Sequence, residues 1–151
     1  WQGLIPDDDR VRFIRDFWKR RDPTPATAQN EFRDTFERRV AFADRAFGSS
    51  DSRGSVTDRG KVFVLLGEPS LVRRRPLTNR DNVVLFERIP IVNGTMEEWF
   101  YPREKLPITI GKKGVQLHFV TQRGIGDGVL QRDDVYAFQA LAAATNPGER
   151  H

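Results

Sequence analysis

Residues 57–60, Thr-Asp-Arg-Gly, place a carboxylate next to a guanidinium immediately before an apolar run. Two adjacent opposite charges could bind a polar or ionic ligand. The same residue types also have an architectural use, because Thr and Asp side chains accept hydrogen bonds from backbone N–H groups in turns. Gly60 permits a close backbone approach. We expect the architectural role, with Arg59 paired to Asp22 or Glu31.

A second polar group flanks the connection between two expected N-terminal helices. Arg21-Asp22 precede a short Pro-rich connection and Asn30-Glu31 follow it. A buried network of such groups must be fully hydrogen-bonded, and it then fixes one geometry of helices and sheet. A polar pocket for a small anionic ligand is the alternative. The expected structural polar network comprises Arg21, Asp22, Asn30, Glu31, Thr57, Asp58 and Arg59.

Three consecutive arginines and a Glu-Glu-Trp run are the other candidate features. Residues 73–75 are expected in a loop, where they could contact an acidic partner or lipid headgroups. Glu97 and Glu98 beside Trp99 are residue types that a glycosidase uses. Neighbours on a strand point to opposite faces, however, so these carboxylates should not converge. The candidate interaction residues are Arg73, Arg74, Arg75 and Trp99.

Several kinds of chemistry are excluded or disfavoured by composition. The chain has no cysteine, which excludes disulfides, thiol catalysis and Cys-ligated metals. Its two histidines are His118, expected in mid-strand, and the terminal His151, which leaves no evident base for a serine nucleophile. Residues 124–128, Gly-Ile-Gly-Asp-Gly, lack the Lys-Ser/Thr of a phosphate loop and indicate a hairpin turn. We therefore expect no catalytic residue, no metal site and no cofactor.

Length and charge restrict the class of protein further. A chain of 151 residues with 38% hydrophobic residues has the size of a single domain, residues 1–151, with a true core. The net charge of +4 is spread without a basic patch, which argues against nucleic acid as a partner. No run of about 18 apolar residues appears. Because the chain opens on Trp1, we expect residues before it, and a signal peptide, a lipid anchor and a membrane helix all stay open.

The first expected helix covers residues 5–20. Pro6 suits a first helical turn, and the three aspartates that follow are favoured at a helix N-terminus. Val11, Ile14 and Trp18 form one apolar stripe. The charged and apolar positions together predict an amphipathic helix.

The second expected helix covers residues 27–47. Thr27 is the expected N-cap, with Glu31 near the first turn. Gly48 fits the position after the helix. The apolar stripe consists of Phe32, Phe36, Val40, Ala43 and Phe47. Core packing is the expected role of this stripe, and a ligand groove is the alternative.

After residue 60 the pattern indicates strands. Residues 61–66, Lys-Val-Phe-Val-Leu-Leu, suggest a strand covered on both faces. Further strands are expected at 82–89, 97–102, 115–122 and 128–131, and a short helix at 136–145. Two helices followed by strands predict an α+β fold, with the helix pair packed on a mostly antiparallel sheet of about four to five strands.

Together these motifs resemble the GWxTD domain family, a bacterial, envelope-associated domain family of unestablished function. The likeness covers roughly residues 13–130. The matching positions are Phe17, Trp18, Arg21, Asp22, Pro23, Thr24, Pro25, Thr27, Asn30, Glu31, Gly54, Thr57, Asp58, Arg59, Gly60, Gly67, Pro69, Trp99 and Tyr101. Ser55 occupies the place of the namesake tryptophan, so a contact of that residue is lost or changed here.

The resemblance implies a periplasmic or otherwise extracytoplasmic location, with membrane attachment through a segment outside this sequence, and no established catalysis. We expect a non-enzymatic interaction or scaffolding module, an accessory subunit at the periplasmic face of a membrane protein complex. Its expected partner is a protein, with the membrane surface as a further contact. One alternative is a ligand-binding or hydrolytic domain for cell-wall or polysaccharide material that uses Glu31, Asp58 and Arg59. An envelope-assembly factor is the other alternative.

Overall fold

The computed structural model describes residues 7–78, 81, 84–85, 89–90, 93–106, 113–122 and 125–145. The chain divides into two compact units, residues 1–39 and 40–151. The helix α2 (Glu31–Phe47) contributes its first half to one unit and its second half to the other. The expectation of a single domain stays a prediction.

The first unit contains α1 (Asp7–Arg20) and the start of α2. Trp18 of α1 packs against Phe32 and Phe36 of α2, with ring centroids 6.2 and 5.4 Å away. The predicted start of the second helix at Thr27 is wrong, because α2 begins at Glu31. Asn30 caps this helix by accepting a hydrogen bond from the N–H of Arg33 at 2.9 Å.

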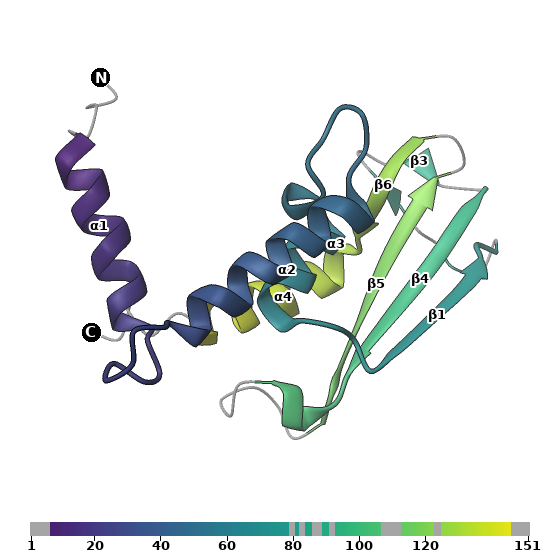
Figure 1. Cartoon of the computed structure of the whole chain (residues 1–151). Helices are drawn as coiled ribbons and strands as arrows, with labels where there is room; N and C mark the ends of the chain where they lie inside the picture. The colour runs from purple at the N-terminus through teal and green to yellow at the C-terminus, as the bar shows by residue number, and fades with distance from the viewer. Residues whose placement is uncertain are drawn as a thin grey trace. The chain divides into compact units, whose positions relative to one another are not determined.

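The second unit is built around a four-stranded antiparallel sheet in the order β1-β4-β5-β6. Its helices α3 (Asp58–Leu66) and α4 (Arg132–Thr145) lie together on one face of this sheet (Figure 1). The strands are β1 (Leu71–Pro76), β4 (Gly94–Tyr101), β5 (Val115–Gln122) and β6 (Ile125–Leu130); a separate pair is formed by β2 (Val84–Leu85) and β3 (Ile89–Pro90). The sheet and the C-terminal helix α4 (Arg132–Thr145) confirm the predicted α+β class.

The segment 61–66 was expected as a strand, and that prediction is wrong. These residues belong to a helix, α3 (Asp58–Leu66). A short apolar run does not distinguish a buried strand from a buried helix, because both are covered on several sides. Val62 and Leu66 face the core, whereas Phe63 stacks on Phe42 of α2 at 4.6 Å between ring centroids. Packing on two sides removes the amphipathic pattern that would have indicated a helix.

A second correction concerns residues 73–75, which were expected in a loop. They lie in β1, whose register pairs Arg73 with Glu98 and Arg74 with Glu97 of β4. Three successive arginines do not show the alternation of apolar and polar residues by which a strand is recognised in a sequence. The ion pairs of Arg74 with Glu97 and of Arg75 with Glu98 join the two strands instead.

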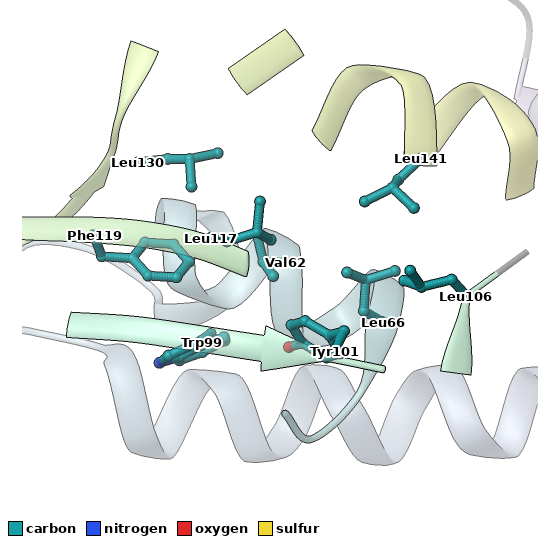
Figure 2. Close-up of a cluster of buried hydrophobic side chains, with 9 residues drawn as sticks. All are labelled: Val62, Leu66, Trp99, Tyr101, Leu106, Leu117, Phe119, Leu130 and Leu141. Carbon is teal, nitrogen blue, oxygen red and sulfur yellow. The ribbon is translucent and has the colours of Figure 1, made fainter. Parts of the chain in front are cut away.

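The core lies between the sheet and the helices, as Figure 2 shows. Trp99 and Tyr101 of β4 and Phe119 of β5 are at most 2% exposed. They pack with Val62 of α3 and Leu141 of α4. The helices α3 and α4 thus cover the inner face of the sheet.

Tyr101 also links the core to the end of α3. Its hydroxyl donates a hydrogen bond of 2.9 Å to the carbonyl oxygen of Gly67. Gly67 ends the helix with a φ of 79°, in the left-handed region that favours glycine. The bond therefore fixes the turn from α3 into β1.

We predict that Tyr101→Phe lowers the free energy of unfolding by about 1–3 kcal/mol, because the buried carbonyl of Gly67 loses its donor. Chemical denaturation measures this change. Tyr136→Phe is the matched control, since Tyr136 is 70% exposed and should be neutral. Equal stability of the two variants would contradict the role of the Tyr101 hydroxyl.

Candidate functional site

The segment Gly54–Gly60, called the corner below, connects α2 to α3 through the 3-10 turn η1 (Gly54–Val56). A Cβ atom on Gly54 would lie 1.9 Å from the carbonyl oxygen of Ala43. One on Gly60 would lie 1.8 Å from the carbonyl oxygen of Gly54. The turn is therefore packed backbone to backbone between two helices, which only glycine allows at these two positions.

Thr57 and Asp58 supply the hydrogen bonds of the corner. Thr57 is the N-cap of α3: its hydroxyl donates to the carbonyl of Gly54 at 2.7 Å and accepts from the N–H of Gly60 at 3.1 Å. A carboxylate oxygen of Asp58 accepts from the N–H of Leu130 at 3.0 Å. Asp58 thereby joins the start of α3 to the end of β6, residues 72 positions apart. This geometry supports the architectural interpretation of Thr-Asp-Arg-Gly.

Arg59 contacts the sheet, where it lies beside Glu97 of β4. The expected pairing with Asp22 or Glu31 stays a prediction. The guanidinium of Arg59 lies 3.7 Å from the carboxylate of Glu97 and 5.5 Å from the ring centre of Phe47. Among the described side chains, its Nε atom is a buried donor with no hydrogen-bond acceptor. Gly128 of β6 makes room for this group, since a Cβ there would lie 3.2 Å from Nε.

Glu97 is the centre of a buried polar cluster, called the Glu97 cluster below. It is 7% exposed and accepts hydrogen bonds of 2.6 Å from the indole N–H of Trp99 and from Nε of Arg74. With Arg59 also near, a buried carboxylate has compensating positive charge on two sides. Sequence reasoning missed this role. The signal was an acidic residue on the same strand face as Trp99 and Tyr101.

The comparisons with known proteins bear on these residues. The sequence matches the GWxTD domain over residues 1–83, which is more than half of the chain. The chain belongs to the GWxTD domain family. No curated protein and no solved structure matches it.

The polar residues of the first unit of this GWxTD domain form local contacts. Glu31 accepts a hydrogen bond from the hydroxyl of Thr24, which lowers the pKa of Glu31. Asp22 accepts from the N–H of Thr24 at 3.0 Å, and Asn30 donates to the carbonyl of Trp18 at 2.8 Å. Arg21 lies 3.8 Å from the ring centre of Phe17. The expectation that these residues join Thr57, Asp58 and Arg59 in one network stays a prediction.

The candidate interaction residues have different surroundings. Trp99 is 2% exposed, so its burial argues against contact with a partner. Arg74 pairs with Glu97, and Arg75 pairs with Asp81 at 2.7 Å. Two hydrogen bonds from Arg75 and those from Thr78 lower the pKa of Asp81.

Ser55 stands where the family carries its tryptophan. Its backbone N–H donates to Asp44 at 2.8 Å, and Arg53 donates to the other carboxylate oxygen at 2.9 Å. Hydrogen bonding from Ser55, and then from Arg53, lowers the pKa of Asp44 to about 2. Sequence reasoning assigned no role to Asp44. The structure identifies it as the acceptor that holds the loop before the corner.

An open hollow of about 600 Å³ lies beside this loop. It is lined by Asp44, Gly48, Ser49, Ser50, Asp51, Ser52 and Arg53. None of the predicted site residues lines it. In the part of the chain that the structure describes, no cluster of three or more His, Asp or Glu side chains is placed to hold a metal ion.

His118 and Asp134 form a further pair that sequence reasoning missed. Asp134 of α4 accepts from the backbone N–H of His118 at 2.7 Å and contacts its Nδ1 at 2.9 Å. The end of β6 pairs with Phe119, so the N–H of His118 lies beyond the last residue of β6. The carboxylate of Asp134 accepts the hydrogen bond from this N–H in place of a strand. A pairing across 16 residues, between a strand and a helix, leaves no local sequence signal.

We predict that Asp58→Ala lowers the free energy of unfolding by about 1–3 kcal/mol, because the N–H of Leu130 loses its acceptor. Denaturant unfolding measures the effect. Asp58→Asn, which retains an acceptor oxygen, should lower the free energy of unfolding by less than Asp58→Ala does. An unchanged free energy for Asp58→Ala would contradict the structural role and favour the ligand-site interpretation of the corner.

We predict that Ser55→Ala raises the pKa of Asp44 from about 2 toward its ordinary value of 3.8, because it removes the hydrogen bond of the Ser55 hydroxyl, the largest cause of the lowered pKa, and leaves those of the Ser55 backbone N–H and Arg53. Because the pKa is depressed in the folded state, Asp44 contributes stability above about pH 3.8, and that contribution is lost as the pH falls toward 2. A carboxyl-detected NMR titration measures the pKa. Ser49→Ala is the control, and an Asp44 midpoint unaffected by Ser55→Ala would contradict the assignment.

Proposed function

We propose that this GWxTD domain is a non-enzymatic protein-interaction module that works outside the cytoplasm. It serves as an accessory subunit at the periplasmic face of a membrane protein complex. The observation that carries the proposal is the exposed strand β1 at one edge of the sheet. Leu71 of β1 is 45% exposed and lies directly opposite Phe100 of β4, which is 38% exposed, so the two side chains share one face of the sheet. Val72, on the other face of β1, is 44% exposed. Grouped exposed apolar side chains mark protein contacts more often than scattered ones.

The polar residues that could have formed a catalytic site support the same proposal. Asp58, Arg59 and Glu31 each contact neighbouring groups of the domain itself. A hydrolytic site would need such groups to converge on a space that a substrate can enter. The proposed location and membrane complex follow the family resemblance. Within the described residues, no helix is both long and apolar enough to cross a bilayer.

A second candidate function is the binding of hydroxyl-rich cell-wall or polysaccharide material. The hollow beside Asp44 favours it, because its lining of serines, aspartates and an arginine offers donors and acceptors without an apolar floor. The observation is weaker than the one for β1, since the hollow is open and Arg53 already pairs with Asp44.

We predict that a photo-crosslinking amino acid at Val72 captures one membrane protein in native membranes, in stoichiometric amounts. The same amino acid at Tyr136 is the control, because Tyr136 is exposed and belongs to α4 rather than to the edge strand. Mass spectrometry identifies the product. Capture at Tyr136 but not at Val72 would keep a protein partner and remove β1 from its interface. No capture at either position would contradict the proposal and direct the search to glycans.

A further inference from the structure

The strand β1 is the first in the sheet order β1-β4-β5-β6, so among the residues that the structure describes only one of its sides pairs with another strand. Its register with β4 runs without interruption from Leu71 to Pro76. An edge strand presents a row of backbone N–H and C=O groups that can pair with a further extended chain. The term "β1 edge" below means residues 71–76 together with Phe100.

The opposite side of the sheet is protected in a different way. The N–H of Leu130 is bonded by Asp58 at 3.0 Å, and the N–H of His118 is bonded by Asp134 at 2.7 Å. Carboxylates from two helices thus occupy strand donors on that side. Across the described residues, no side chain accepts a hydrogen bond from a backbone N–H of β1.

The charges of the β1 edge are unequally compensated. Arg74 pairs with Glu97 at 2.6 Å, and Arg75 pairs with both Asp81 and Glu98. Arg73 lies opposite Glu98 in the register, but the carboxylate of Glu98 is 3.4 Å from Arg75. Within the described part of the chain, Arg73 has no ion-pair partner. One exposed positive charge therefore lies between the apolar pair Leu71–Phe100 and the two compensated arginines.

From these contacts we propose that the β1 edge binds an extended acidic segment of a partner protein as an added strand. A carboxylate of that segment pairs with Arg73, and its apolar residues cover Leu71, Val72 and Phe100. Backbone pairing supplies the affinity, and the alternate side chains supply the selectivity. The ion pairs of Arg74 and Arg75 hold β1 in place before binding, so little conformational entropy of β1 is lost when the partner binds. This inference rests on the proposed function and names the chemistry of its partner.

A second copy of the chain does not fit the β1 edge as well. Antiparallel pairing of two β1 strands over their full length would place Arg73 of one copy opposite Arg74 of the other. Like charges directly opposite each other destabilise a strand pair. The competing explanation is that charged residues and Pro76 simply protect the edge from aggregation. That explanation predicts no binding of an acidic segment.

The test uses the purified chain and a short synthetic peptide of valines with one central glutamate, because Arg73 and Leu71 lie on the same face of β1. A second peptide with lysine in place of glutamate is the matched probe. Two-dimensional NMR follows the backbone amides, and fluorescence anisotropy gives the dissociation constant. We expect the glutamate peptide to shift amides of residues 71–76 and Phe100. The lysine peptide should bind at least about tenfold more weakly, since it brings a like charge to Arg73.

Substitutions at Arg73 separate charge from shape. Arg73→Glu should weaken binding of the glutamate peptide by about tenfold or more, whereas Arg73→Lys should retain most of it. Arg45→Glu is the control for net charge, because Arg45 is exposed on α2 and belongs to no described ion pair. The melting temperature of each variant verifies that it is folded.

Each outcome bears on the inference. No binding of the glutamate peptide, binding that shifts amides elsewhere, or equal binding by the Arg73→Glu variant would overturn it. A dimer that depends on β1, observed by light scattering without peptide, would replace the partner segment by a second copy. If crosslinking at Tyr136 captures a membrane protein while the peptide fails, the proposed function stands and this inference falls.

Discussion

The close approach of backbone segments at the corner is the constraint on which the rest of the second unit depends. Gly54 and Gly60 allow the η1 turn to lie against Ala43 of α2 and against the start of α3. Neither position has space for a Cβ atom, so the path from α2 to α3 is fixed by backbone contact. The direction of α3 then determines where Val62 and Leu66 enter the core and where Asp58 meets the end of β6.

The Glu97 cluster connects the corner to the sheet. Arg59 leaves the corner toward Glu97 of β4, which also binds Arg74 of β1. A single buried carboxylate thus contacts a helix, the edge strand and the core tryptophan. Removing one partner of such a group leaves an uncompensated charge. The family motif and the β1 edge are therefore parts of one structural arrangement, in which the motif residues position the surface proposed to bind a partner.

Several features of the site could be predicted from the sequence and others could not. The architectural role of Thr57 and Asp58 follows from side-chain chemistry, because these residues bond to nearby backbone in turns. The contact of Arg59 with Glu97 could not be predicted, because Glu97 lies 38 positions further along the sequence and only the folding of the sheet brings it near. The strand β1 was missed because Arg74 and Arg75 are compensated by Glu97 and Glu98, residues of another strand.

The sequence by itself determined the family, the α+β class, the strand 115–122 and the two N-terminal helices, because apolar periodicity, caps and the Gly-x-x-Thr-Asp-x-Gly spacing are local signals. Tertiary structure alone decided the state of residues 58–66. Their apolar run fits a strand or a helix, and packing between Phe42 on one side and the sheet core on the other selects the helix. It also decided which charges are used within the fold and which remain exposed, since ion pairs between strands depend on register rather than on neighbours in sequence.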